Sequence, residues 1–136
     1  HGWKPHCEVQ AIASQCSVLA FPSIREFGGG AVLEAMALGL CPVVLDYAGP
    51  SEIVTVETGY KVPMGTREAV VSNLGEQLNY CADHPQEVRA KGLKARERVH
   101  TQFTWEVKAS QVMQVYDWVL KRRKDKPAFF PLPADG

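Results

Sequence analysis

The sequence predicts an α/β fold, a Rossmann-like parallel sheet flanked by helices. Two apolar runs, Val18–Phe21 and Pro42–Leu45, have the continuous hydrophobicity of strands that are buried on both faces. A segment of good helix formers, Ala31–Leu38, lies between them and is followed by Gly39, which suits the end of a helix. Because 46% of the 136 residues are hydrophobic, the chain can bury one core, and we expect a single domain over residues 1–126.

A helix is expected before this β-α-β unit, and a short helix and a third strand are expected after it. Apolar residues recur at helical spacing from Val9 to Cys16, which predicts a helix before the first strand. Ser51 is expected to cap a short helix that runs through Val54, and Gly59–Val62 is expected to form a third strand.

Three longer helices complete the predicted fold. The first is capped by Thr66 and runs to about Cys81, the second begins at Pro85, and the third runs from about Thr104 past Leu120. The apolar residues expected on buried faces are Val88, Ala95 and Val99 on the second helix, and Val112, Tyr116 and Val119, with Trp105 as a core anchor, on the third.

Charge and cysteine content argue against several classes of function. Fifteen basic residues balance fifteen acidic ones, so the chain lacks the positive field that attracts a nucleic-acid backbone, and no nucleic-acid partner is expected. The four cysteines are far apart and form no Cys-x-x-Cys pair, so we expect reduced core thiols and no metal site; they are Cys7, Cys16, Cys41 and Cys81. No apolar run is long enough to span a bilayer, and these features together favour a cytoplasmic location.

The segment that indicates chemistry places two carboxylates, Glu26 and Glu34, around the triple glycine Gly28-Gly29-Gly30. Glycines allow the backbone to come close to a ligand, and a helix N-terminus directly after them offers unpaired N–H groups to an anion such as phosphate. Loops that follow parallel strands gather at one edge of the sheet, so residues 23–30 and 46–52 are expected to open together.

Carboxylates repel a diphosphate but accept protons from hydroxyl groups, so the expected ligand has both phosphate and polyol parts. A nucleotide sugar has this composition. In this interpretation the glycine-loop amides bind phosphate, one of the two glutamates binds ribose hydroxyls and the other binds sugar hydroxyls.

The same residues match a known family. Pro22-Ser23 before Glu26, and Glu34-Ala35-Met36-Ala37 after seven intervening residues, resemble the Glu-x7-Glu signature of retaining glycosyltransferases with the GT-B fold, in particular those of family 4. The further matches, in the family's order, are Gly39-Leu40-Cys41-Pro42-Val43-Val44, Gly49-Pro50-Ser51-Glu52-Ile53, and Phe103-Thr104-Trp105 with Tyr116 beyond. The resemblance extends from about Gly2 to Leu120 and implies the C-terminal part of a donor-binding domain.

By this resemblance, Glu26 contacts the donor sugar, positions it and stabilises charge as the catalytic-site residue. Glu34 holds the ribose. The resemblance implies that Phe27, Gly28 and Gly29 present backbone N–H groups to the sugar and phosphates of the donor substrate. It also implies that Gly30 and Ala31 form the start of a helix directed at the diphosphate. Such enzymes transfer the sugar with its anomeric configuration kept, from a UDP-, GDP- or ADP-linked donor, and generally need no metal or other cofactor.

Two departures from the family pattern are visible. The usual Glu-Gly-Phe-Gly is replaced by Glu26-Phe27-Gly28-Gly29-Gly30, which keeps the spacing. The family's N-terminal acceptor domain, which would bind a glycan or a lipid-linked acceptor, is absent from this sequence, as are the basic residues that usually neutralise the diphosphate. Lys4 and Arg25 are the nearest cations in sequence, and we expect the isolated chain to have no transferase activity.

Several assignments keep an alternative. Arg25, Ser51 and Glu52 are additional site candidates, although Ser51 also suits a helix cap and Glu52 a partner for a helix dipole. A module that binds a nucleotide or sugar phosphate without catalysis is the alternative function, and a structural domain that has lost the site is a third.

Two segments near the C-terminus suggest partners. The basic run Lys121–Lys124 is expected to be a solvated helix end, with a peripheral contact to the inner face of an anionic membrane as the alternative. The Pro-rich tail, residues 127–136, carries two phenylalanines and is a candidate surface for self-association or for a further domain.

Overall fold

The computed structural model describes residues 2–129 of the chain. The elements follow the expected α/β order: α1 (His6–Ala13), β1 (Val18–Phe21), α2 (Gly30–Ala37), β2 (Cys41–Leu45), α3 (Ala48–Ile53), β3 (Tyr60–Val62), α4 (Arg67–Asp83), α5 (Pro85–Gln102) and α6 (Trp105–Val119). By its packing the chain divides into two units, His1–His100 and Thr101–Gly136.

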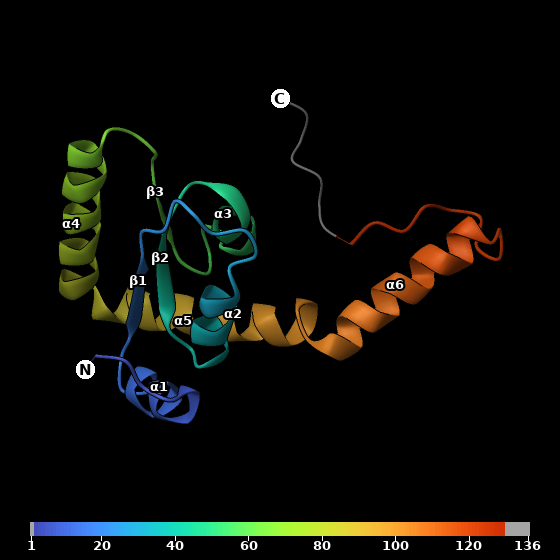
Figure 1. The fold of residues 1–136 in the computed structure, drawn as a ribbon, viewed down its shortest axis with the longest axis horizontal. Helices are drawn as coiled ribbons and strands as arrows, with labels where there is room; N and C mark the ends of the chain where they lie inside the picture. Colours follow the sequence, from blue (N-terminus) through green and yellow to red (C-terminus); the bar gives the residue numbers. More distant parts are fainter. Residues whose placement is uncertain (1, 130–136) are drawn as a thin grey trace. The chain divides into compact units, whose positions relative to one another are not determined.

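The first unit is built on a three-stranded parallel sheet in the order β1-β2-β3 (Figure 1). Val18 pairs with Cys41 and Val43 pairs with Tyr60. All five residues of β2 are buried, as continuous apolarity predicts for a central parallel strand. The predicted α/β class and parallel sheet are therefore confirmed.

Helices cover both faces of this sheet, with α4 on one side and α2 and α3 on the other (Figure 1). Alternate residues of β2 join the core beneath α4 and α5, which consists of Cys41, Val43, Leu45, Val62, Cys81 and Val88. On α2, Val32 and Met36 are fully buried. The glycine loop is consequently connected to a helix that is anchored in the core.

A close backbone approach fixes α5 against the turn after α2. A Cβ atom on Gly92 would lie 2.2 Å from the carbonyl oxygen of Gly39, a separation that no side chain tolerates. The predicted apolar face of α5 is confirmed, because Val88, Ala95 and Val99 are all buried.

A polar cluster joins β3, α4 and α5 around Glu87. The hydroxyl groups of Tyr60 and Tyr80 donate to its two carboxylate oxygens at 2.8 and 2.9 Å. Lys91 Nζ lies 3.7 Å from the same carboxylate and 4.7 Å from the centre of the Tyr60 ring. The hydrogen bonds from Tyr60 and Tyr80 hold the pKa of Glu87 below its ordinary value.

Helix starts were partly predictable. Thr66 accepts a hydrogen bond from the Ala69 N–H at 3.3 Å, and Thr104 accepts one from the Val107 N–H at 3.3 Å, so both predicted caps are confirmed. The predicted Ser51 cap is wrong, because α3 begins at Ala48 and Ser51 lies inside it. The Ser51 hydroxyl donates to Asp46 Oδ1 instead.

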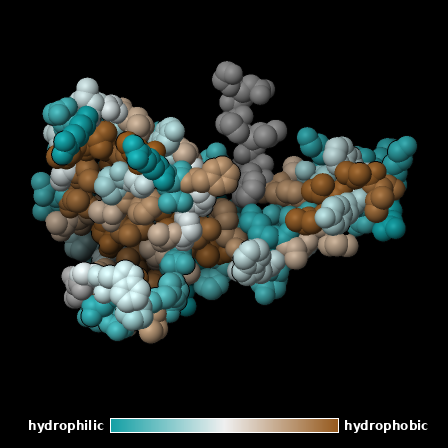
Figure 2. All heavy atoms as spheres, viewed as in Figure 1, coloured by the Kyte–Doolittle hydropathy of each residue, from teal (hydrophilic) through white to brown (hydrophobic). Residues whose placement is uncertain are grey.

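The expected burial of two sets of residues is also wrong. Cys41 and Cys81 are buried free thiols, and burial raises the pKa of Cys41 to about 12. Cys7 and Cys16 are exposed, Cys7 on α1, which buries none of its residues, and Cys16 in the turn after it. On α6, the expected buried stripe and core anchor are exposed: Trp105, Val112, Tyr116 and Val119. Among residues 101–129 this unit contains one complete helix, so the stripe has no partner element within its own unit, and Figure 2 shows apolar side chains over α6.

Two further predictions concern membranes and the tail. None of the helices in residues 2–129 is both long and apolar enough to cross a bilayer. Most of the Pro-rich tail, residues 130–136, lies outside the described residues, so self-association through it stays a prediction.

We predict that Gly92→Ala lowers the free energy of unfolding by about 1–3 kcal/mol, because the added methyl group overpacks the contact with Gly39. Gly75→Ala is the matched control. Gly75 lies in α4 with nothing within 4 Å of its Cβ position, so alanine there should raise the free energy of unfolding by about 0.5–1 kcal/mol. Urea unfolding of the three proteins measures both changes, and equal shifts of the same sign would contradict the packing of α5.

We also predict that Glu87 contributes to the acid sensitivity of the fold. Its folded-state pKa lies below the ordinary value of 4.5, so its stabilising contribution is present above that value and is lost as the pH falls through the folded-state pKa. Glu87→Gln should therefore reduce the loss of unfolding free energy between neutral and acidic pH.

The control for this measurement is Glu76→Gln, because the Glu76 carboxylate accepts a single surface hydrogen bond, from Ser72 at 3.3 Å. Urea unfolding at both pH values compares the variants. An acid sensitivity in Glu87→Gln that equals the sensitivity of the wild type would show that the tyrosine hydrogen bonds do not act through this carboxylate.

Candidate functional site

The loops that follow β1 and β2 meet at the carboxyl edge of the sheet. A Cβ atom on Gly49 would lie 2.3 Å from the carbonyl oxygen of Phe27, so the start of α3 is in backbone contact with the glycine loop. The prediction that the two loops open on one edge is confirmed by this contact. Glycine at position 49 is what permits it.

The glycine loop takes a conformation that requires glycine at its centre. Gly29 has φ +65° and forms the N-cap of α2, and a Cβ atom there would lie 2.8 Å from Ile53 Cδ1. By contrast, the Cβ positions of Gly28 and Gly30 have no atom within 4 Å. Gly29 is therefore needed for the fold of the loop, while Gly28 and Gly30 leave open space beside the backbone.

Glu26 folds back onto this loop. Its Oε1 atom accepts hydrogen bonds from the Gly28 and Gly29 N–H groups, at 3.2 and 2.9 Å. A carboxylate held by two amides shows that the loop presents its N–H groups to an anionic oxygen. The same two bonds fix where the Glu26 carboxylate stands.

The next two amides are open. Gly30 and Ala31 are the first residues of α2, where N–H groups have no acceptor within the helix. Within residues 2–129 no other acceptor reaches them, and both residues are exposed. The site thus has two amides bound to Glu26 and two that are available to a ligand.

Glu34 lies one turn into α2, and its side chain is 60% exposed. Helical side chains lean toward the N-terminus, so the Glu34 carboxylate belongs to the same end of α2 as the open amides. Its Oε2 atom lies 3.4 Å from Nε2 of His6, the first residue of α1. The structure therefore brings the two predicted glutamates and the predicted amides to one helix end.

The other predicted site residues lie near this end but differ in their contacts. The Phe27 ring is 97% exposed, and Arg25 is exposed with its N–H group 3.4 Å from Ser23 Oγ. Glu52 is exposed on α3, whereas Ser51 is engaged with Asp46. Lys4, the other cation expected near the phosphates, pairs with Glu8 at 3.1 Å.

Three residues at this edge were not predicted from sequence. His6 contacts Glu34, which lies 28 positions away in the sequence. Asp46 follows β2 directly, and Lys61 Nζ lies 3.8 Å from its Oδ1 atom. An acidic residue at the carboxyl end of a buried strand was the available signal for Asp46, whereas no local pattern indicates the His6 contact.

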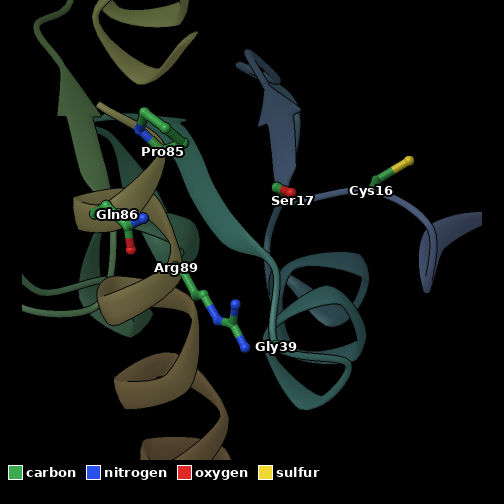
Figure 3. Close-up of a pocket in the computed structure, with 6 residues that line it drawn as sticks. All are labelled: Cys16, Ser17, Gly39, Pro85, Gln86 and Arg89. Carbon is green, nitrogen blue, oxygen red and sulfur yellow. The ribbon is translucent and has the colours of Figure 1, made fainter. Parts of the chain in front are cut away.

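A pocket of about 400 Å³ lies elsewhere in the first unit, lined by Cys16, Ser17, Gly39, Pro85, Gln86 and Arg89 (Figure 3). Its lining residues precede β1 and β2 or begin α5, so it opens at the amino ends of the strands. Ligands of parallel sheets bind at the carboxyl ends, where the glycine loop and both glutamates lie. The candidate site is therefore the open edge and not this pocket.

Comparison with known proteins agrees with this fold and site. A family model described as glycosyl transferases group 1 matches residues 1–79. The chain is 32% identical over 115 residues to alpha-maltose-1-phosphate synthase from Mycolicibacterium smegmatis, covering 82% of this chain and 30% of that protein. It is 31% identical over 115 residues to MMP alpha-(1->4)-mannosyltransferase from Mycolicibacterium hassiacum, covering 85% of this chain and 28% of that protein.

A solved structure is also similar. Sucrose-phosphate synthase from Thermosynechococcus elongatus matches with a TM-score of 0.74 and 29% identity, over 90% of this chain and 30% of that chain. The likeness supports the predicted GT-B fold. The chain thus has the α/β architecture of a glycosyltransferase and belongs to the glycosyl transferases group 1 family. It spans about 30% of the length of its relative from M. smegmatis.

We predict that Gly49→Ala displaces the glycine loop, because its methyl group would lie 2.3 Å from the Phe27 carbonyl oxygen, well inside contact distance. The variant should lose about 1–3 kcal/mol of unfolding free energy and shift the amide NMR signals of Gly28 and Gly29. Gly28→Ala, with open space at its Cβ, is the control and should leave the Gly49 signal in place. Unchanged Gly28 and Gly29 signals in Gly49→Ala would contradict the contact between the loops.

Proposed function

We propose that this chain supplies the C-terminal half of the donor-binding domain of a retaining glycosyltransferase of the family 4 type, and that it binds a nucleotide sugar at the N-terminus of α2. One observation carries the proposal. Open amides and two carboxylates stand together at the carboxyl edge of a parallel sheet, on a chain that belongs to a glycosyltransferase family. This set offers donors to phosphate and acceptors to hydroxyls.

The diphosphate belongs at the open amides of Gly30 and Ala31. These N–H groups stand at the positive end of the α2 dipole, where an anion is favoured. The space beside Gly28 and Gly30 lets a bulky phosphate approach the backbone. Phe27 contributes its N–H group and an exposed ring beside the same loop.

Glu26 is proposed to bind and position the donor sugar. With Oε1 held by two amides, the carboxylate can accept sugar hydroxyls through Oε2 without having to be ordered first. Its negative charge also suits the positive charge that develops on the sugar ring as the bond from its anomeric carbon to the diphosphate breaks. The acceptor hydroxyl oxygen then bonds to that carbon, its proton passes to the departing diphosphate oxygen, and the electron pair of the broken bond leaves with the nucleoside diphosphate.

Glu34 is proposed to bind the two ribose hydroxyls. A carboxylate accepts from vicinal hydroxyls in pairs, and the exposed Glu34 carboxylate stands one turn beyond the phosphate amides. Ser51 and Glu52 are proposed as lesser contacts from α3. Asp46 holds Ser51, and this fixes the direction of the Ser51 hydroxyl.

Two parts of the reaction are proposed to depend on residues outside this chain. These are acceptor recognition and much of the diphosphate neutralisation, because Lys4 pairs with Glu8 and Lys61 lies beside Asp46, which leaves the exposed Arg25 as the cation next to the loop. The relatives are more than three times as long as the part of them that this chain matches.

We predict that the 136-residue chain does not transfer sugar. Incubation with UDP-, GDP- and ADP-sugars and mixed glycan or lipid-linked acceptors should give no product, because the residues that bind the acceptor and neutralise the diphosphate are proposed to lie in other parts of the protein. Detection of a transferred sugar by mass spectrometry would contradict this.

We predict that Glu34→Gln weakens nucleoside diphosphate binding about tenfold, since a hydrogen bond to a charged group contributes about 1.5–3 kcal/mol. Glu68→Gln, in the exposed first turn of α4, is the control and should bind as the wild type does. Ligand-observed NMR with UDP, GDP and ADP at millimolar concentration measures the affinities. Equal binding by both variants would overturn the proposed ribose contact.

A further inference from the structure

Helix α1 is linked to the candidate site by a single side chain. None of the residues of α1 is buried, so the helix contributes little to the core. Within the described part of the chain, the other hydrogen bonds and ion pairs of α1 stay inside residues 4–16. The contact from His6 Nε2 to Glu34 Oε2 is the exception, and it reaches a proposed ligand residue.

The chemistry of this pair favours one arrangement. A neutral histidine carries its proton on one of the two ring nitrogens, and a carboxylate only accepts hydrogen bonds. The Glu34 carboxylate therefore selects the form in which Nε2 carries the proton, and the protonated ring donates in the same way. In both states the Nε2–H group donates to Oε2 and leaves Oε1 for another partner.

An exposed glutamate without such a contact samples several rotamers. Ordering a flexible side chain when a ligand binds costs about 0.5–1.5 kcal/mol. The contact with His6 restricts Glu34 before the ligand arrives, and it does so from a separate helix, α1.

We infer that His6 is a positioning residue that orients Glu34 for the ribose hydroxyls of the donor. This inference rests on the proposed function and deepens it. It implies that the preference for a nucleotide with both ribose hydroxyls over one without them depends on α1. His6 acts through Glu34 and has no role in the chemistry at the sugar.

The test compares ribose with 2′,3′-dideoxyribose. Affinities of the whole chain for UDP, GDP and ADP, and for their 2′,3′-dideoxy counterparts, are measured by ligand-observed NMR. The ratio of the two affinities reports the hydroxyl contacts alone, because phosphate and base are the same in each pair. If His6 had a merely structural role, its substitution would lower the affinity for both ligands equally and leave the ratio unchanged.

The variants are His6→Ala, which removes the donor, His6→Gln, which keeps an N–H donor, and Glu34→Gln, with His100→Ala as the control at an exposed position of α5. We expect His6→Ala to lower the ribose preference about threefold to tenfold, in line with the loss of one hydrogen bond. His6→Gln should recover part of the preference, and His100→Ala should keep all of it. Because α1 buries no residue, the two His6 variants should fold as the wild type does.

Each failure has its own signature. A ribose preference that is lost in Glu34→Gln but unchanged in His6→Ala would overturn the inference and leave the proposed function in place. A wild-type chain that shows no ribose preference, or binds none of the three nucleotides, would overturn the proposed ribose contact and the inference with it.

Discussion

The backbone contact between Gly49 and Phe27 is the constraint on which the site depends. It brings the start of α3 against the loop that follows β1, at a distance that excludes any side chain. The two loops belong to neighbouring strands, so their relation is set first by the parallel pairing of β1 and β2 and then by this contact. Beneath them, the fully buried β2 and the buried residues of α2 keep the loops from moving apart.

On this base the two carboxylates are held in different ways. Backbone amides of its own loop hold Glu26, so its position follows directly from the turn at Gly29. A side chain from α1 holds Glu34, and this contact spans 28 positions. The amides of Gly30 and Ala31 lie between the two glutamates along the chain and are not used by the fold. Two fixed carboxylates that accept hydrogen bonds, with open amide donors between them, suit a ligand that has hydroxyls at both ends and phosphates in the middle.

The sequence predicted most of the fold because its signals were local or periodic. Continuous apolarity predicted β1 and β2, and the threonine caps predicted α4 and α6. The errors have a common physical cause. Helical spacing at Val112 and Tyr116 indicates an apolar face but not whether a partner covers it. In the same way, the apolar spacing of α1 predicted a helix but not that Cys7 on it would be exposed. Ser51 has the residue type of a cap, yet Asp46 binds it inside a helix that starts three residues earlier. The Glu26 and glycine-loop positions were predictable because they lie in one segment, whereas the His6 contact joins α1 to α2 across 28 positions of sequence.

The central claim is that this edge binds a nucleotide through its own residues, and a two-dimensional amide NMR titration with UDP, GDP and ADP tests it most directly. The account predicts signal shifts confined to residues 26–34 and 46–52, larger for one nucleotide than for the other two. Shifts confined to the opposite edge, at Ser17, Gly39 and Arg89, would contradict the account, and so would a well-dispersed spectrum that does not change with any nucleotide.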